Sequence, residues 1–234
     1  LRRVAHTTQI VTTVAGIGTA GFNGDNVAAT VAQVNVPSGV AVDQAGHVFI
    51  ADTFNHRVRR VDAVTGEITT VAGNGSAGPL GDGASATAAQ LNFPLDVAVD
   101  GAGNVLIADS FNNRVRRVDA ITGVITTVAG NGMAGYAGDG AAATAAQLDF
   151  PVGIALDADQ DILIADGNNH AVRLVNRTSG AIATIAGTGI AGYNGDNQAA
   201  ATALIDSPYR LAVEPSGTVL LTEAGGMRVR RIGQ

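Results

Sequence analysis

The sequence contains no cysteine, no tryptophan and no lysine, and only 4% of its residues are aromatic. Without cysteine the chain can form neither disulfides nor thiolate metal sites. With so few aromatic residues, a core must be built mainly from Val, Ile, Leu and Ala, which suits tightly stacked sheets better than a large apolar cavity. Hydrophobic residues make up 46% of the chain, which is enough for such a core.

Positive charge is also scarce. All 14 basic residues are arginine, and the formal net charge is −6. This balance opposes a general affinity for phosphate backbones, so we do not expect a nucleic-acid partner. No apolar run approaches the roughly 20 residues that a membrane-spanning helix needs, so we expect no membrane insertion.

The chain begins with Leu rather than Met, and no signal peptide is present. We therefore expect that it was processed, excised or engineered. The sequence leaves its compartment open, with a secreted or periplasmic location favoured.

A repeat of 57 residues organises the sequence. The motif Val-Arg-Arg-Val begins at Val58 and again at Val115, and related motifs begin at Val172 and Val229. The clearest unit, residues 93–130, divides into short apolar segments separated by turn-forming residues. The strands expected in it cover residues 94–100, 104–109, 114–119 and 124–129. Four short strands per repeat, joined by tight turns, are typical of a β-propeller blade.

The strand count predicts a single all-β domain over residues 1–234, a propeller of four four-stranded blades. The last unit supplies only three strands, whereas residues 10–14 have the pattern of a fourth strand. Because a propeller must eliminate open edges, we expect this N-terminal strand to complete the last blade. One third strand, at residues 1–4 or 229–232, is then surplus, so we expect a monomer or a dimer formed through surplus edge strands. The alternative is that the chain is a fragment of a larger, six-bladed propeller.

A long glycine-rich insert precedes each first strand, and each insert carries an aspartate just before an Ala-rich run. These aspartates are Asp25, Asp82, Asp139 and Asp196. We interpret them as N-caps of short helices such as residues 84–91. Calcium binding is the alternative role, and calcium is the only cofactor that we consider. We expect Leu91 and Phe93, with their equivalents, to fill the space between blades.

Acidic and basic residues flank the turn between the second and third strands. Asp52 with Arg57, and Asp109 with Arg114, are expected to form cross-strand ion pairs. The third unit departs from this pattern, since Ala171 stands where the other units have arginine.

The sequence resembles the NHL-repeat family of β-propellers. The resemblance rests on the second strand ending in Ala-Asp, on Asn55-His56 before the third strand, and on the Arg-Val-Arg-Arg-Val that follows. The insert TVAGNG…GDG…ATAAQL…FP is similar to the long-repeat form common in bacterial NHL proteins. The resemblance implies a propeller, more often of six blades. It leaves function open, because the family includes scaffolds, RNA-binding modules and the lyase domain of a copper-linked amidating enzyme.

The resemblance also bears on metal binding. Those lyase relatives hold zinc through histidines at the start of inner strands, and no such position is histidine here. We therefore expect no metal site. His56 and His170 lie instead at the family's turn position, where a hydrogen bond that braces the hairpin is the ordinary role.

The inserts and the turns between second and third strands vary most among the repeats, and both are expected on one face of the ring. Variable loops on a regular scaffold are the usual layout of a binding surface, although drift at unconstrained turns would give the same pattern. We expect a non-enzymatic scaffold or binding module that binds a peptide, a protein or a glycan on this insert-bearing face. Its aromatic contact candidates are Phe22, Phe54, Phe111, Tyr136 and Tyr193.

The starts of the first strands line the central channel. Asp96 and Arg210 are expected there on opposite blades, and Tyr209 precedes Arg210. This charged pair either grips a small polar ligand or forms a salt bridge across a narrow pore. The alternative function is a hydrolase or lyase at the channel mouth that uses these three residues, with or without a metal. No Ser/His/Asp arrangement, phosphate loop or paired carboxylates stand out.

Overall fold

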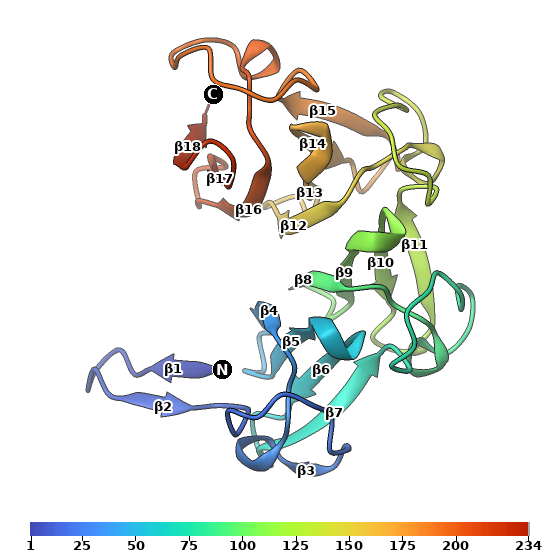
Figure 1. Cartoon of the computed structure of the whole chain (residues 1–234), viewed down its shortest axis with the longest axis vertical. Coiled ribbons are helices and arrows are strands. Elements are labelled where there is room, and N and C mark those ends of the chain that lie inside the picture. The colour runs from blue at the N-terminus through green and yellow to red at the C-terminus, as the bar shows by residue number, and fades with distance from the viewer. Residues whose placement is uncertain (234) are drawn as a thin grey trace.

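The structure is a computed structural model that describes residues 1–233, and four of its five antiparallel sheets are arranged as the blades of a propeller (Figure 1). Blade 1 consists of β4 (Pro37–Val42), β5 (Val48–Asp52), β6 (Arg57–Val61) and β7 (Glu67–Ala72). Blade 2 consists of β8 (Pro94–Val99), β9 (Val105–Asp109), β10 (Arg114–Val118) and β11 (Ile125–Ala129). Blade 3 consists of β12 (Pro151–Leu156), β13 (Ile162–Asp166), β14 (Ala171–Val175) and β15 (Ile182–Ala186). Blade 4 consists of β16 (Pro208–Val213), β17 (Val219–Glu223) and β18 (Arg228–Ile232). The predicted all-β propeller of four blades is confirmed.

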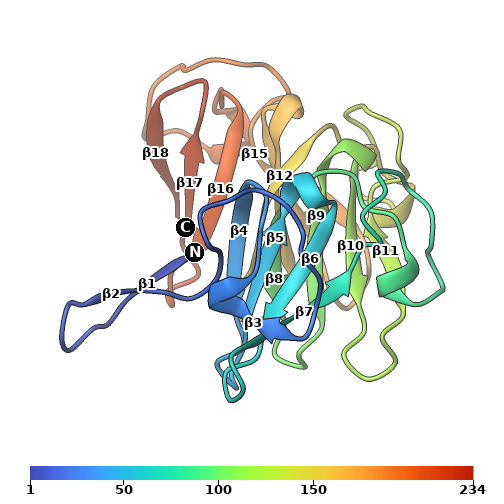
Figure 2. The same ribbon diagram turned by 60° about the horizontal axis from the view of Figure 1, so that its bottom comes forward.

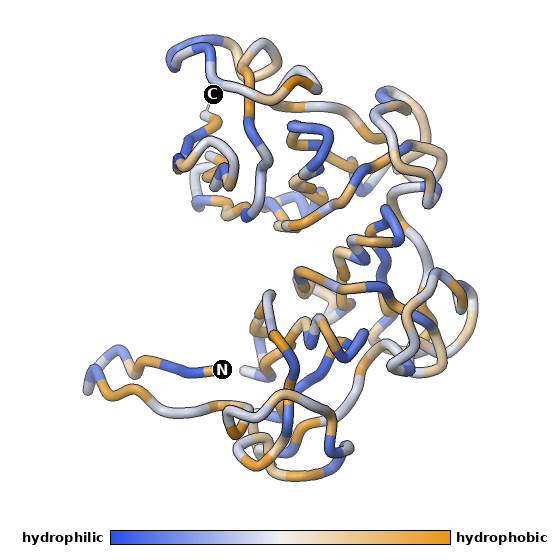
Figure 3. Tube along the Cα trace, in the orientation of Figure 1, coloured by the Kyte–Doolittle hydropathy of each residue, from blue (hydrophilic) through white to orange (hydrophobic). Residues whose placement is uncertain are grey.

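The second strand is the most buried element of blades 1, 2 and 4, and in blade 3 it is as buried as the third strand. All five residues of β9 are buried, and its two neighbours pair with it in antiparallel register. The apolar core lies between facing blades: one cluster joins Ala51 and Val58 of blade 1 to Val97 and Ile107 of blade 2. Apolar and polar residues alternate along much of the strands, as the changing colours of Figure 3 show. The second strands VFIAD, VLIAD and ILIAD are instead almost continuously apolar, which lets the middle of each of these sheets bury both of its faces.

Each long insert crosses the outer edge of the blade that follows it. In the first insert, β3 (Val27–Ala28) pairs with β7, and single bridges such as Ser85↔Val124 repeat this contact in the next unit. Each insert contains one short 3₁₀ helix. These helices are η1 (Ala29–Val31), η3 (Ala86–Ala88), η5 (Ala143–Ala145) and η7 (Ala200–Thr202). No helix among residues 1–233 is long and apolar enough to span a bilayer.

The helix expected over residues 84–91 is only the single turn η3, and the N-cap interpretation is wrong. Ser85 precedes this turn and makes no capping hydrogen bond with its side chain. Asp82 instead forms an ion pair with Arg116, 2.7 Å away. Leu91 fills the space between blades 1 and 2 as expected, since it is fully buried in their shared cluster. Phe93 is only half-buried and packs against other aromatic rings.

The expected closure of the ring is wrong. The N-terminal strand β2 (Val11–Thr13) pairs with β1 (Arg2–Val4) as a hairpin that projects from blade 1 (Figures 1 and 2). Within residues 1–233, blade 4 therefore ends at β18, and the four blades follow an open arc. The two N-terminal strands are themselves a third and a fourth strand of the repeat. Pairing them across a short loop costs less chain entropy than pairing β2 with β18 across the ring.

We expect Leu91→Ala to lower the free energy of unfolding by about 2–5 kcal/mol, because the truncation leaves a cavity between two blades. Leu80→Ala is the matched control, since Leu80 lies in the same insert and is 66% exposed. Urea unfolding followed by circular dichroism measures both variants. Equal losses in the two variants would contradict the placement of Leu91 in the core.

Candidate functional site

Four phenylalanines form a continuous row across the hairpin turns and insert ends of blades 1 to 3. Successive ring centroids of Phe54, Phe93, Phe111 and Phe150 lie 5.0, 4.9 and 5.1 Å apart. The first and last pairs meet edge to face, with interplanar angles of 86° and 87°. Phe54 and Phe111 remain 51% and 55% exposed. We name this set the aromatic row.

The hairpin turns position two members of the row. A 3₁₀ turn joins the second strand to the third in each of the first three blades. These turns are η2 (Thr53–Asn55), η4 (Ser110–Asn112) and η6 (Gly167–Asn169). Phe54 lies in η2 and Phe111 in η4, whereas blade 3 has Asn168 at the equivalent position. The row therefore ends at Phe150.

The other two members are held by hydrogen bonds between blades. The Phe93 N–H donates to Nδ1 of His56 at 3.2 Å, and the Phe150 N–H donates to Oδ1 of Asn113 at 2.9 Å. Because an N–H can only donate, His56 must accept through Nδ1. Burial lowers the pKa of His56, helped by the charge of Arg57, which favours this neutral form. The His56 side chain thus braces the next blade's insert, whereas within its own hairpin the bond is made by its backbone N–H, which donates to the Thr53 carbonyl oxygen at 3.1 Å.

The structure brings two of the five predicted aromatic candidates, Phe54 and Phe111, into the aromatic row. Sequence reasoning missed Phe93 and Phe150 as members, because they were assigned to the interior. A signal was present: each directly precedes the proline that starts a first strand, and each has a left-handed φ, 50° and 55°. Such a conformation turns the chain sharply before the strand.

The channel mouth holds the predicted charged pair. The Asp96 carboxylate lies 3.4 Å from the Arg210 guanidinium and is 7% exposed. Arg210 also donates to the carbonyl oxygens of Val152 and Leu95, each at 3.0 Å, so it ties the first strands of blades 2, 3 and 4 together. Burial raises the pKa of Asp96, whereas the charge of Arg210 opposes that rise. Tyr209 lies beside them, 40% exposed, with the Arg210 guanidinium 4.9 Å from its ring centroid.

The contacts of the Asp96 carboxylate leave little of it accessible to a substrate. Asp96 accepts a hydrogen bond from the Ile154 N–H at 3.1 Å in addition to its ion pair, and Gly39 packs directly against its side chain. A general base needs access to a proton on a substrate, and this carboxylate is enclosed by backbone and by Arg210. In residues 1–233, no three His, Cys, Asp or Glu side chains lie close enough together to hold a metal ion.

An arginine of the third strand bridges two acidic side chains in every blade and is fully buried in blades 1 to 3, and sequence reasoning missed it. In blade 2, Arg116 lies 2.7 Å from Asp82 of the insert and 3.5 Å from Asp109 at the end of β9, and its side chain is fully buried. The equivalent arginines are Arg59, Arg173 and Arg230. The signal was their invariance within the repeat, since even the divergent VRLV motif keeps Arg173.

The cross-strand ion pairs expected in the sequence are therefore wrong. Asp52 and Arg57 are register partners, but the ion pair of Asp52 is with Arg59, 3.5 Å away. Arg57 instead donates to the carbonyl oxygens of Asn55 and Asn74. Residues two apart along a strand lie on the same face of the sheet, so Arg59 shares its face with Arg57 and can reach Asp52 from there. Arg59 also contacts the insert at Asp25.

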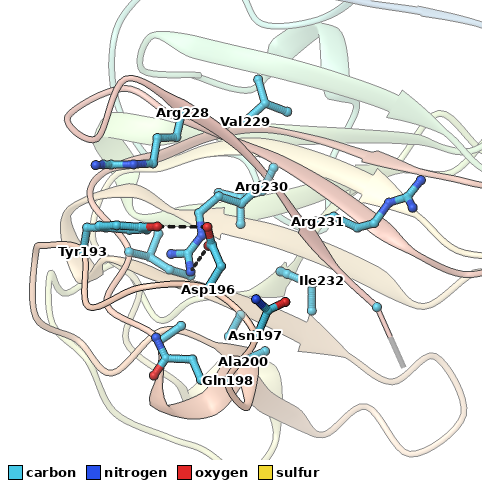
Figure 4. A pocket seen from close by; sticks show the side chains of 15 residues that line it. Tyr193, Asp196, Asn197, Gln198, Ala200, Arg228, Val229, Arg230, Arg231 and Ile232 are labelled. Carbon is cyan, nitrogen blue, oxygen red and sulfur yellow. Dashed lines mark hydrogen bonds and ion pairs between the residues drawn. The ribbon is translucent and has the colours of Figure 1, made fainter.

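The remaining three aromatic candidates lie at the outer rim, on the bridging arginines. Phe22 covers Arg59 at 4.7 Å, Tyr136 covers Arg173 at 5.2 Å and Tyr193 covers Arg230 at 5.3 Å, measured from ring centroid to guanidinium carbon. Phe22 and Tyr193 lie closer still to a second arginine, Arg57 at 4.0 Å and Arg228 at 3.8 Å, so each of these two rings attracts two guanidinium groups. Figure 4 shows Tyr193 beside Arg228 and Arg230. Pro79 occupies the equivalent place in the second insert. These three rings therefore lie apart from the aromatic row.

We expect Arg116→Ala to lower the free energy of unfolding by about 3–5 kcal/mol, because it leaves the buried Asp109 without a cation. The control is Arg117→Ala, whose side chain is 36% exposed and whose ion pairs are 3.6 Å or longer. That change should cost about 0–1 kcal/mol. Chemical unfolding of the two variants gives the comparison, and similar losses would refute a structural role specific to the bridging arginine.

The carboxyls beneath the arginines predict an unusual pH dependence. Burial raises the pKa of Asp109 and of Asp166 to about 6, from an ordinary 3.8. The folded chain therefore binds more protons than the unfolded chain between about pH 4 and pH 6, and stability from these groups is lost as the pH rises through 6. We expect the chain to be more stable at pH 5 than at pH 7.

Asp109→Asn should reduce this gain, whereas Asp119→Asn should preserve it. Hydrogen bonds within its turn lower the pKa of the exposed Asp119, so this group does not titrate between pH 5 and pH 7. Thermal denaturation at the two pH values gives the measurement. An identical gain in the unmodified chain and in Asp109→Asn would show that Asp109 is ionised throughout.

Three segments of the chain match the model of a known repeat family. Residues 35–61, 91–118 and 148–173 match the family model for the NHL repeat. The chloroplastic protein SUPPRESSOR OF QUENCHING 1 of Arabidopsis thaliana is 30% identical over 151 residues, which cover 62% of this chain and 14% of that protein. NHL repeat-containing protein 2 of Bos taurus is 31% identical over 152 residues, covering 60% of this chain and 20% of that protein.

Solved structures share the fold at low identity. A protein of unknown function from Bacteroides thetaiotaomicron matches with a TM-score of 0.68 and 19% identity, over 83% of this chain and 46% of that one. An auxiliary nutrient binding protein from Bacteroides ovatus matches with a TM-score of 0.65 and 20% identity, over 87% and 49%. A gluconolactonase from Xanthomonas campestris matches with a TM-score of 0.59 and 16% identity, over 85% and 58%. The chain thus spans about half the length of these structures and at most a fifth of those two curated relatives.

Proposed function

The chain belongs to the NHL-repeat β-propellers, and from this premise we propose that it is a binding module whose aromatic row receives an apolar segment of a peptide or protein. The observation that carries the proposal is the row itself: four rings in continuous contact, with Phe54 and Phe111 about half exposed. Exposed aromatic rings of this kind contribute much of the energy of protein interfaces.

The row is preorganised for binding. Phe93 and Phe150 are held by hydrogen bonds to the hairpin of the preceding blade, and Phe54 and Phe111 lie in short 3₁₀ turns between buried strands. A ligand that packs on such a surface loses little free energy to ordering of the protein. Because the inserts and hairpins carry the residues that differ between repeats, the same face can also discriminate among ligands.

The ring geometry favours a peptide over a glycan. Sugar rings pack best on the flat face of an aromatic side chain, whereas neighbouring rings in this row meet edge to face at 86° and 87°. The resulting ridge presents both edges and faces, which suits irregular apolar side chains. A peptide segment with aromatic or branched aliphatic residues fits this surface.

The enzymatic alternative, a hydrolase or lyase acting through Asp96, Tyr209 and Arg210, is less well supported. Those residues do meet at the channel mouth, and a gluconolactonase shares the fold at 16% identity. The two charges, however, are engaged with each other and with backbone groups of three blades. The same contacts describe a structural ion pair that holds the first strands together.

Selection from a phage-displayed library of random 12-residue peptides tests the proposed ligand class. We expect enrichment of peptides rich in aromatic and aliphatic residues, with affinity for Phe54→Ser/Phe111→Ser reduced by about tenfold or more, which corresponds to at least about 1.4 kcal/mol. Val64→Ser/Ile121→Ser is the matched control, since these residues are 90% and 95% exposed in the short turns that follow the third strands.

Circular dichroism confirms that both double variants are folded before binding is compared. Failure to enrich any peptide, or equal binding of the selected peptides to both double variants, would reject the aromatic row as the site. An immobilised glycan array, probed with the same proteins, identifies a glycan ligand if that class binds instead.

A further inference from the structure

A crevice of about 540 Å³ opens between blades 2 and 3, at the ends of the strands opposite to the aromatic row. Its floor is apolar and is formed by side chains of both blades: Leu106, Val128, Leu156, Ile162 and Val175. Polar residues of the short turns line its mouth, among them Gln160, Arg177 and Ser179. Clefts of roughly 300–1,000 Å³ that combine an apolar lining with a few polar groups are the usual sites of small-molecule binding.

Leu106 stands at the position that a phenylalanine fills in blade 1. That phenylalanine, Phe49, packs in one cluster with Val105 of blade 2, and Val105 is only 3% exposed. Between blades 2 and 3 the equivalent of Val105 is Ile162, which is half-buried although its side chain is larger. The smaller Leu106 therefore leaves apolar surface uncovered between blades 2 and 3.

Arg117 supplies a cation at one wall of the crevice. It is the register partner of Leu106, so both side chains lie on the same face of blade 2, toward blade 3. Its side chain is 36% exposed. The acidic groups of Asp100 and Asp119 lie 4.0 and 3.6 Å from it, and within residues 1–233 its guanidinium donates no hydrogen bond. Its N–H groups are therefore available to a ligand.

The equivalent arginine of blade 1 is occupied. Arg60 donates to the Asp62 carboxylate at 2.7 Å and contacts a ring nitrogen of His47 at 2.8 Å. Blade 2 carries Asn104 at the position of His47, and the Asn104 side chain makes its hydrogen bonds with turn residues instead. This replacement leaves Arg117 without the partner that holds Arg60.

A second arginine lines the opposite wall. Arg177 of blade 3 stands where blade 2 has Ala120, it is exposed, and among residues 1–233 its guanidinium has no acidic partner. The carboxylates at the crevice are already engaged. Asp100 accepts from its own turn and from the Asn104 side chain, and Asp161, 8% exposed, accepts from the Arg177 N–H at 2.8 Å. The crevice thus presents two cations above an apolar floor.

Gln160 connects the two walls at the mouth. Its side chain accepts from the Gly101 N–H of blade 2 at 2.7 Å and donates to the Asp157 carbonyl oxygen at 3.2 Å. It has a left-handed φ of 64°, at a position where blades 1 and 2 have glycine, Gly46 and Gly103. Such strain persists only where the surrounding structure requires it, and it is common at ligand sites. The mouth of the crevice is therefore braced before a ligand binds.

We propose that this crevice binds a small amphipathic anion, an apolar ring system or chain that carries one carboxylate or sulfonate. The apolar body covers the surface at Leu106 and Ile162 that a phenylalanine covers between blades 1 and 2. The anionic group lies against Arg117 and Arg177, because charge-assisted hydrogen bonds to a guanidinium are stronger than neutral ones. The site is separate from the aromatic row and does not depend on the ligand proposed for that row.

Fluorescence titration with anilinonaphthalene sulfonate, a dye of apolar rings with one sulfonate, tests the site. We expect saturable binding, and an affinity for Leu106→Phe reduced by about tenfold or more, because the new ring fills the crevice. Phe54→Ser/Phe111→Ser should bind the dye as the unmodified chain does. A lack of saturable binding, unchanged binding to folded Leu106→Phe, or a loss confined to Phe54→Ser/Phe111→Ser would overturn the proposal.

A second comparison tests the anionic group without a substitution in the core. We expect Arg117→Ala/Arg177→Ala to bind the sulfonate dye about tenfold more weakly, but to bind phenylnaphthylamine, the same rings without the sulfonate, with unchanged affinity. Arg60→Ala/Arg231→Ala is the matched control, because it removes the same charge at third-strand positions of blades 1 and 4. Circular dichroism confirms that the variants are folded. Equal losses for both dyes, no loss for either, or a similar loss in the control would overturn the proposal.

Discussion

The bridging arginine on the third strand is the interaction on which the rest of the structure depends. Each long insert contains little regular structure beyond one 3₁₀ turn, and apolar contacts alone leave its backbone groups to be satisfied. In blade 2 the guanidinium of Arg116 binds the insert at Asp82 and also at the carbonyl oxygen of Gln90, 2.6 Å away. It reaches the buried Asp109 from the same position. One side chain thus attaches both halves of the insert to the end of the second strand.

This attachment also fixes the position of the aromatic row. The insert ends at the residue before each first strand, so fixing the insert also fixes Phe93 and Phe150. The carboxylate of Asp109 extends the network, since it accepts from the Asn92 N–H and from the side chain of Asn112 in the hairpin turn. Insert end and hairpin turn are therefore joined through one buried carboxylate, and the phenylalanines that they carry meet in a row. The aromatic row is therefore a rigid surface, and the ion pair between Asp96 and Arg210 connects the first strands of blades 2, 3 and 4.

The strand order of the repeat explains why β18 has one unpaired edge within residues 1–233. A third strand of this family has two edges that need partners, and a fourth strand has one. In β1 and β2 the chain pairs a third strand with a fourth strand locally, and β18 keeps one open edge within residues 1–233. The constraint is therefore one of pairing: β2 cannot serve β1 and β18 together, because both would use the same edge in the same register.

Local patterns in the sequence were sufficient for the repeat, for the four blades and for strand limits that differ by one residue in residues 93–130. Alternation of apolar residues and turn-forming residues are properties of neighbouring positions, and they decide which segments become strands. The family resemblance likewise rested on short motifs, and Leu91 was recognisable as a core residue. Phe54 and Phe111 could be identified as exposed aromatic residues because the turns between the second and third strands carry them.

The contacts between distant segments were decided only in three dimensions. Arg116 meets Asp82 across 34 residues of sequence, and the spacing of charges near the hairpin suggested other partners. Phe93 joins the aromatic row because its backbone turns out of the core, which no periodicity indicates. The pairing of β2 with β1 depended on competition between two edges with the same sequence pattern. Equivalent repeats make such choices invisible in the sequence, since each candidate partner satisfies the local pattern equally well.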